Sequence, residues 1–392
     1  MQDTPEDTPP TAAADRRLGF LCAGDPTRVD TYSGIHHAML RHLEAEHGGP
    51  MPLIGHAAVR VRPWRRRVDR VRRRLRLPVA RERYNAAAHL RLIRDDLRRH
   101  GTRVVYAPIA TGLVARFDGD ARVITYSDST PRLLRGYYAT HGGPDDAAAF
   151  HQSEEVERRA LRRADAAVYA SGWAAASAVE HYDADPAKVH VVPFGANIAG
   201  DGLPPETIAG RGLDGPLRLL YIGKYWQRKG GDIAVEALTH LRETGVDAVL
   251  HIVGTAPPRA LPEGVVYEGF FDKAKAAGRA AFDDLLSRCH LFVLPTRAEC
   301  FGVALVEASA YGLPPVSTDT GGIPAIVEPG VTGELLPLEA GPAAWAERIA
   351  ALWADRPRYR AMSLAARKKY ETRLNWTVWA RDILRIADAL DA

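Results

Sequence analysis

The sequence predicts an α/β protein built from mostly parallel sheets with helices packed around them. Three observations favour this fold class. Short apolar segments of strand length alternate with helix-like segments along most of the chain. The alternation occurs twice, on either side of residues 196–216, which are rich in Gly, Pro and Ala. The chain of 392 residues is also too long for one ordinary core and suits two domains of roughly 180 residues.

The first series of elements covers residues 16–195. It begins with a strand at 17–23, and a loop ending in Gly34 leads into a helix at 35–46. Strand, glycine-bearing loop and helix form the start of a nucleotide-type α/β unit, although the spacing is not G-x-G-x-x-G. Gly34 would let a backbone approach a pyrophosphate or a sugar, whereas a plain capping turn with Ser33 as N-cap explains it equally well. The later elements are helices at 84–100, 151–163 and 173–181 and strands at 103–106, 122–126, 166–170 and 189–193.

The second series covers residues 217–375 and is followed by a last helix at 376–390. Its expected strands lie at 217–222, 249–253, 265–268, 290–294 and 315–318. Its expected helices lie at 232–242, 280–288, 303–311, 342–354 and 357–371. Residues 196–216, between the two series, are the predicted linker.

The stretch 295–307 combines a strand end, a loop and a helix start. Ligands of open α/β sheets bind beyond the carboxyl ends of strands, where the free N–H groups of the next helix favour an anion. Glu299 lies in the predicted loop and Glu307 in the first two turns of the helix. Because carboxylates are poor phosphate ligands, we expect these two to contact the hydroxyls of a sugar or ribose. Two solvated side chains are the alternative.

Arg228 and Lys229 belong to a predicted loop, 223–231, directly before the helix at 232–242. They place two cations where a helix N-terminus already favours negative charge, the arrangement that a diphosphate needs. A surface Arg-Lys pair is the alternative, and the flanking glycines argue against it.

Composition describes an ordinary soluble protein, with 46% hydrophobic and 26% charged residues and a formal charge of +4. That charge is too small to indicate nucleic acid, and no recognisable nucleic-acid module is present. The three cysteines, Cys22, Cys289 and Cys300, lack metal-ligand spacing and suggest a reducing compartment. Residues 1–15 lack the apolar core of a signal peptide and suit a disordered tail. We therefore expect a cytoplasmic protein.

Ten arginines lie between residues 59 and 76, the first at Arg60 and the last at Arg76. Apolar residues recur among them at helical spacing, as in a basic amphipathic helix suited to an anionic membrane surface or an acidic partner. The run fits peripheral contact with the inner membrane face. A solvated face of an arginine-rich protein fits equally well, and the sequence leaves both interpretations open.

Taken in order, a set of motif residues resembles a family 4 glycosyltransferase of the GT-B fold. The pair Glu299 and Glu307 around Phe301 matches the family's Glu-seven-residues-Glu signature, and Arg228-Lys229-Gly230 matches its phosphate-binding cations. The resemblance covers nearly everything after the tail. The residues that carry it are Gly34, Lys224, Arg228, Lys229, Glu299, Phe301, Gly302, Glu307, Gly321 and Gly322.

The resemblance implies two Rossmann-like domains facing each other across a cleft, with residues 376–392 crossing back onto the first. It implies a hexosyltransferase that moves a sugar from a nucleotide-diphosphate sugar to a hydroxyl acceptor, retaining configuration and needing no metal or other cofactor. Arg228 and Lys229 would neutralise the departing diphosphate, Glu299 would contact the donor sugar and Glu307 the ribose. The further donor-binding residues implied are Gly34, Lys224, Gly302, Val303 and Ala304.

The sequence departs from the family pattern in three places. Ser127-Asp128 stands where many relatives carry His-Asp, so Asp128 is the one polar candidate at the acceptor edge. Lys224 replaces the usual Arg, which keeps the charge but loses the bidentate fork. Ala325 stands where a Glu commonly follows Gly-Gly-Ile-Pro.

The sequence leaves two other functions open. One keeps the fold but uses phosphate or water as acceptor, as in a phosphorylase or hydrolase. The other is a non-catalytic protein that binds a sugar nucleotide. A dinucleotide-dependent dehydrogenase fits poorly, because neither half has the required glycine fingerprint with its downstream acid. The sequence leaves the sugar, the nucleotide and the acceptor open, the last being a glycan, a glycolipid or a small natural product.

Overall fold

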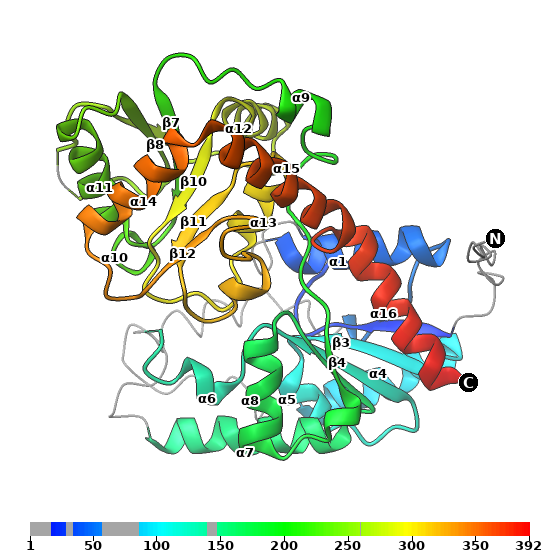
Figure 1. Ribbon diagram of the computed structural model, residues 1–392. Helices are drawn as coiled ribbons and strands as arrows, with labels where there is room; N and C mark the ends of the chain where they lie inside the picture. The colour runs from blue at the N-terminus through cyan, green and yellow to red at the C-terminus, as the bar shows by residue number, and fades with distance from the viewer. Residues whose placement is uncertain (1–16, 29–33, 57–85, 139–146, 259) are drawn as a thin grey trace, which may run out of the picture. The chain divides into compact units, whose positions relative to one another are not determined.

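The computed structural model describes residues 17–28, 34–56, 86–138, 147–258 and 260–392, and it confirms the predicted α/β class (Figure 1). Two six-stranded sheets form the framework, each accompanied by helices. The predicted tail at 1–15 and the arginine run at 59–76 lie outside the described residues. No helix among the described residues combines the length and apolarity needed to cross a membrane.

The first sheet has the strand order β2-β1-β3-β4-β5-β6. Strand β1 pairs in parallel with both β2 and β3, so the strand order reverses next to β1. Strand β2 was not expected, because a two-residue strand is too short for a pattern. The strands are β1 Leu18–Leu21, β2 Leu53–Ile54, β3 Val104–Pro108, β4 Arg122–Ser127, β5 Ala166–Tyr169 and β6 Val189–Val191. The accompanying helices are α1 Ile35–His47, α4 Ala86–His100, α5 Thr111–Val114, α6 Pro131–Leu134, α7 Ala147–Arg163 and α8 Gly172–Tyr182.

The second sheet has the order β12-β11-β10-β7-β8-β9, and all its neighbouring strands run parallel. Its strands are β7 Leu217–Gly223, β8 Ala248–Gly254, β9 Val265–Gly269, β10 Leu291–Leu294, β11 Pro315–Thr318 and β12 Glu334–Leu336. The helices that follow β6 are α9 Pro205–Ala209, α10 Trp226–Lys229, α11 Gly231–Glu243, α12 Ala276–Arg288, α13 Val303–Ala310, α14 Pro342–Ala354, α15 Arg356–Thr372 and α16 Trp376–Asp391.

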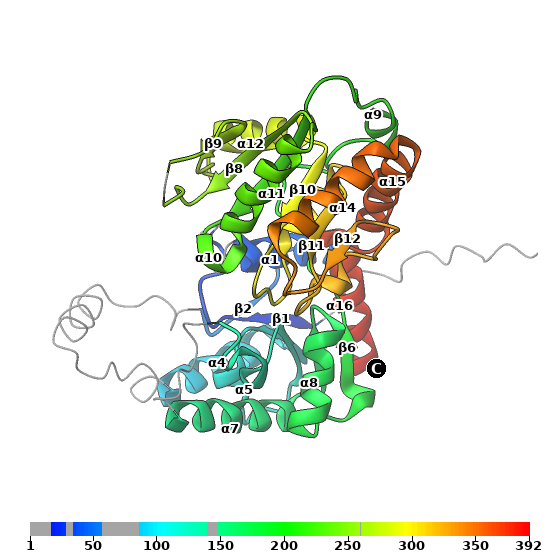
Figure 2. The ribbon, with the colours of Figure 1, turned by 60° about the vertical axis from the view of Figure 1, so that its left-hand side comes forward.

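Continuous apolar runs form the central strands of the second sheet because helices cover both of its faces. All four residues of β10 are buried, and so are all four of β11. Helices α11 and α14 lie side by side in both views (Figures 1 and 2), and α13 packs against α15. Right-handed crossovers from β7 to β8 and from β10 to β11 place α11 and α13 on opposite faces.

The strand order of the second sheet reverses between β7 and β10, its topological switch point. From β7 the chain moves outward through β8 to β9, and from β10 it moves the other way through β11 to β12. Loops that follow the two strands at such a point diverge and leave a crevice for a ligand. The loops after β7 and β10 carry the sequence motifs that contain Lys229 and Glu299.

The described chain divides into two compact units. One holds the described residues up to Tyr126 together with Arg158–Ala167 and Ala380–Ala392. The other holds the described residues of Ser127–Glu157 and Val168–Trp379. The boundaries expected at residues 195 and 217, and the packing expected of 376–392, stay predictions.

Residues 196–216 contain the short helix α9 and make hydrogen bonds to the end of α13. The N–H of Leu203 donates to the Ala310 carbonyl at 3.1 Å, and Arg211 donates to the Gly312 carbonyl at 2.9 Å. This stretch is therefore tied to the second sheet's helices by its own backbone and side chains.

Candidate functional site

The loop after β7 contains a one-turn helix, α10, which corrects the prediction of an open loop at 223–231. Arg228 and Lys229 form the last turn of α10, where a helix C-terminus favours cations. Gly230 then adopts a left-handed conformation with φ 73° and is the N-cap of α11. The two cations therefore lie between the end of one helix and the N-terminus of the next.

Close backbone contact joins this segment to the loop after β10. A Cβ added at Gly230 would collide with the Pro295 carbonyl, so only glycine permits the approach. The N–H of Arg297 donates to the Arg228 carbonyl at 2.7 Å, and Thr296 Oγ1 donates to the same carbonyl at 3.1 Å. These contacts hold the cations of one loop beside the carboxylate of the other.

Lys229, Arg228 and Glu299 form one cluster at the switch point. The Lys229 ammonium forms an ion pair with Glu299 Oε2, and Arg228 Nη1 lies 3.9 Å from the same oxygen. Arg228 also donates to the Ala298 carbonyl at 2.7 Å. Burial and the neighbouring Arg228 lower the pKa of Lys229 to about 7. Because burial disfavours the ammonium form, an additional negative charge beside Lys229 would stabilise that form.

Glu307 is buried, with 4% of its surface exposed, and is paired with a lysine that the sequence did not reveal. Lys273 Nζ donates to Glu307 Oε1 at 2.8 Å. Burial raises the pKa of Glu307, while the Lys273 ammonium opposes that shift. Each carboxylate of the Glu-seven-residues-Glu motif therefore contacts a different lysine. Lys273 lies in the irregular segment between β9 and α12, where no periodicity singles it out.

The N-terminus of α13 presents backbone donors beside Glu299. Gly302 has φ 100° at the N-cap, and a Cβ there would lie 3.2 Å from Glu299 Cγ. The N–H groups of Val303 and Ala304 occupy the first turn, where they have no intrahelical acceptor. The predicted anion-binding amides therefore border the cluster of Lys229 and Glu299.

The other predicted site residues lie at the edges of the sheets. Gly34 is the N-cap of α1 with φ 83°, in the first compact unit. Lys224 follows β7 and its Nζ lies 5.7 Å from the ring centroid of the exposed Phe270. Asp128 follows β4 and accepts from Ser129 Oγ at 3.4 Å. Asp128 also contributes to the electrostatic environment of Cys300, in the loop of Glu299.

Cys300 is buried, and burial raises the pKa of its thiol to about 11. The buried thiol with its raised pKa fits a residue that lines the loop better than a nucleophile. Among the described residues, no cluster of His, Cys, Asp and Glu could hold a metal ion. Asp185 caps a turn, since its carboxylate accepts from the Ala187 N–H at 3.0 Å.

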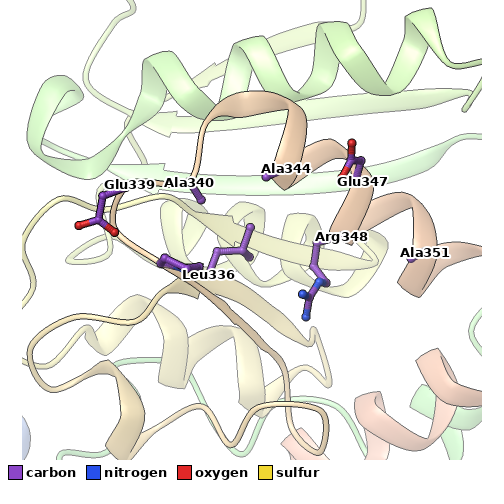
Figure 3. Close-up of a pocket in the computed structure, with 8 residues that line it drawn as sticks. Leu336, Glu339, Ala340, Ala344, Glu347, Arg348 and Ala351 are labelled. Carbon is purple, nitrogen blue, oxygen red and sulfur yellow. The ribbon is translucent and has the colours of Figure 1, made fainter.

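A separate open groove of about 620 Å³ lies beside α14 (Figure 3). Its lining residues come from β12, the following loop and α14, and none is a predicted site residue. They are Leu336, Pro337, Glu339, Ala340, Ala344, Glu347, Arg348 and Ala351. The concave surface there is unrelated to the cluster at the switch point.

Two tyrosines that the sequence did not single out contact the loop of Glu299. The Tyr137 hydroxyl accepts a hydrogen bond from the backbone N–H of Glu299, and the Tyr138 hydroxyl accepts one from that of Cys300. Both tyrosines follow α6, more than 150 positions earlier in the chain. Contacts over such a sequence separation have no local pattern that could predict them.

Sequence comparison identifies the domain that contains most of this site. Residues 216–355 match the family model described as glycosyl transferases group 1. D-inositol 3-phosphate glycosyltransferase of Segniliparus rotundus is 31% identical over 217 residues, covering 52% of this chain and 48% of the relative. Amylovoran biosynthesis glycosyltransferase AmsK of Erwinia amylovora is 30% identical over 207 residues, covering 50% and 51%. The chain thus spans about half the length of the curated relatives it matches. The predicted resemblance to a glycosyltransferase is confirmed for residues 216–355.

Solved structures confirm the predicted GT-B fold. Sucrose-phosphate synthase from Thermosynechococcus elongatus matches with a TM-score of 0.68 at 18% identity, covering 96% of this chain and 99% of that one. HepE of Anabaena in complex with UDP matches with a TM-score of 0.64 at 15% identity, covering 95% and 99%. WaaG, a glycosyltransferase involved in lipopolysaccharide biosynthesis, matches with a TM-score of 0.59 at 17% identity, covering 95% and 99%.

Proposed function

We propose that this protein is a glycosyltransferase that moves a hexose from a nucleotide-diphosphate sugar to a hydroxyl acceptor. The observation that carries the proposal is the cluster of Arg228, Lys229 and Glu299 at the switch point of the second sheet. Two cations and the amides at the start of α13 suit a diphosphate, and a carboxylate beside them suits sugar hydroxyls.

The chemistry that we propose retains the anomeric configuration. The bond between the sugar's anomeric carbon and the diphosphate oxygen breaks while the acceptor oxygen bonds to the same face of that carbon. Negative charge grows on the departing diphosphate, and Arg228 and Lys229 stabilise it. The acceptor proton passes to the departing phosphate. Two protein cations supply the charge stabilisation that a metal ion supplies elsewhere, which is why we propose a metal-independent reaction.

Glu299 has two roles in this proposal. Before the donor binds, it neutralises the buried Lys229, and its ion pair limits the cost of burying that charge. When the diphosphate arrives, Lys229 gains a second anionic partner and Glu299 gains sugar hydroxyls. Glu307, held by Lys273, would accept from the ribose hydroxyls, and Val303 and Ala304 would donate to the phosphates.

The acceptor stays open between a glycan, a glycolipid and a small natural product. D-inositol 3-phosphate is the first compound to test, because several relatives are named as its glycosyltransferases. Contact with an anionic membrane through the run from Arg60 to Arg76, and a cytoplasmic location, are proposals from the sequence alone. Asp128, close to the loop of Glu299, is the proposed polar contact for the acceptor hydroxyl.

Measurement of nucleoside-diphosphate release decides among the candidate activities. The protein is incubated with UDP-glucose and other nucleotide sugars, with and without each acceptor, and the glycoside product is identified by mass spectrometry. We expect nucleoside diphosphate to be released only when a hydroxyl acceptor is present, in an amount equal to the glycoside formed. Equal release without acceptor would indicate a hydrolase, release that needs inorganic phosphate a phosphorylase, and tight binding without turnover a non-catalytic protein.

The pH dependence of nucleotide affinity tests the role of Lys229. With a pKa of about 7, Lys229 loses its charge as the pH rises, so the Kd for a nucleoside diphosphate should increase above neutrality. The increase is at most about tenfold per pH unit. The terminal phosphate, with a pKa of about 6, is already ionised across this range. Calorimetric titrations from about pH 7 to about pH 9 measure this.

The Lys229→Arg variant is the control, because a guanidinium keeps its charge across this range. Its Kd should stay nearly constant between the same pH values, whatever its absolute affinity. Parallel curves for the variant and the natural protein would show that Lys229 is not the titrating group.

A further inference from the structure

Tyr137 and Tyr138, here called the tyrosine pair, bind two consecutive backbone N–H groups in the loop of Glu299. The N–H of Glu299 donates to the Tyr137 hydroxyl at 2.9 Å, and that of Cys300 donates to the Tyr138 hydroxyl at 3.2 Å. The Tyr137 hydroxyl also lies 3.3 Å from the Glu299 carbonyl oxygen and 2.9 Å from Thr320 Oγ1. One phenol therefore contacts both ends of the Glu299 residue and the neighbouring loop after β11.

The rings of the tyrosine pair are fixed by their own packing. The two rings stack with centroids 5.7 Å apart and an interplanar angle of 12°. Trp173 packs against Tyr137 with centroids 5.3 Å apart, and the Arg228 guanidinium lies 4.7 Å from the centroid of Tyr138. Each hydroxyl is thus presented from a constrained ring, and the ring of Tyr138 contacts one of the site's two cations.

Glycine is required where the pair approaches the loop. A Cβ at Gly321, which has φ 57°, would collide with both the Glu299 carbonyl and the Tyr137 hydroxyl. A Cβ at Gly322 would collide with the Cys300 carbonyl. The turn at Gly321-Gly322 therefore serves close packing between the loops, in addition to any contact with a ligand.

Loop amides need acceptors that secondary structure does not supply. Glu299 and Cys300 lie between β10 and α13, outside any strand or helix, and both are buried. A buried N–H without a partner is unfavourable, so the two hydroxyls fix the orientation of these peptides. The orientation of the Glu299 peptide in turn sets the direction in which the Glu299 side chain points.

We propose that Tyr137 and Tyr138 are positioning residues, which hold Glu299 and Arg228 in the geometry that the donor sugar and diphosphate require. This inference rests on the proposed glycosyltransferase function and adds residues that the sequence motifs do not contain. Burial raises the pKa of both phenols, that of Tyr137 to about 12, which agrees with a positioning role through the loop.

The Tyr137→Phe variant removes the hydroxyl and keeps the ring. We expect kcat to fall by about tenfold or more and the Kd for the nucleotide sugar to rise by about fivefold, because Glu299 is no longer held in place. The Kd for the nucleoside diphosphate alone should change by less than about twofold, since Arg228, Lys229 and the amides of α13 remain. Tyr138→Phe is the second variant and should show the same pattern.

Tyr359→Phe is the matched control. The Tyr359 hydroxyl also contacts a backbone group, the His290 carbonyl at 3.1 Å, but at the opposite end of β10 from Glu299. This variant should lose comparable stability with unchanged kcat and Kd values. Loss of activity in Tyr137→Phe that merely follows a fall in Tm, or equal losses in the control, would overturn the positioning role.

Amide hydrogen exchange tests the pair independently of catalysis. The Glu299 N–H should exchange at least about tenfold faster in Tyr137→Phe, and the Cys300 N–H at least about tenfold faster in Tyr138→Phe. Both exchange rates should be unchanged in Tyr359→Phe. Unchanged exchange would refute the contact.

If the natural protein transfers no sugar at all, the proposed function fails. In that case faster exchange with a weaker Kd for the nucleotide sugar still supports the positioning role, and faster exchange with an unchanged Kd overturns it.

Discussion

Replacing Lys229 with alanine is expected to lower kcat by about 10²–10³-fold, which is the cost of removing one charge-stabilising donor from a transition state. The ammonium is placed by the last turn of α10 and is nearly enclosed, so its charge is poorly screened by water. The departing diphosphate gains charge as the glycosidic bond breaks, so the loss should appear in kcat more than in the KM for the donor. Steady-state kinetics with saturating acceptor measures both.

The fold should survive this change, because Arg228 remains 3.9 Å from the Glu299 carboxylate and limits the cost of leaving it buried. Lys275→Ala is the control, since Lys275 is exposed and forms a surface ion pair with Asp272 at 3.6 Å. Its kcat should match that of the natural protein. Near-normal transfer by Lys229→Ala with an intact circular dichroism spectrum would remove Lys229 from the mechanism.

The parts of the fold that were predictable from sequence are those with local signals. The strands at 217–222 and 290–294 are apolar runs of strand length, and the structure places β7 and β10 there within one residue at each end. Helix α14 was predicted with its observed ends, 342 and 354, because a proline at the first helical position marks its start. The motif residues Arg228, Lys229 and Glu299 meet because the carboxyl ends of neighbouring parallel strands share one edge of the sheet.

The remaining features depend on contacts between distant segments. Helix α10 has a single turn, too short for a periodic pattern, and its C-cap Gly230 lies against Pro295. The pairing of Glu307 with Lys273 and of Glu299 with Tyr137 joins residues 34 and 162 positions apart. A motif fixes which side chains are present, whereas their partners depend on how the sheet brings the loops together.

Replacing Gly230 with alanine is expected to destabilise the protein by about 2–4 kcal/mol and to abolish nucleotide binding. Two costs combine at this position. A non-glycine residue at φ 73° costs about 1 kcal/mol by itself. The new Cβ would also collide with the Pro295 carbonyl, so α10 would have to move away from the end of β10 and carry Arg228 and Lys229 with it. Urea unfolding and calorimetric titration with a nucleoside diphosphate measure the two effects.

Gly245→Ala separates the two costs. Gly245 has a similar φ of 86°, but a Cβ added there meets nothing within 4 Å. This control should lose only about 1 kcal/mol, from the backbone conformation alone, and should bind nucleotide normally. The difference between the variants then measures the close approach of the two loops at the switch point. Equal destabilisation, or unchanged nucleotide affinity in Gly230→Ala, would show that the cations do not depend on this contact for their position.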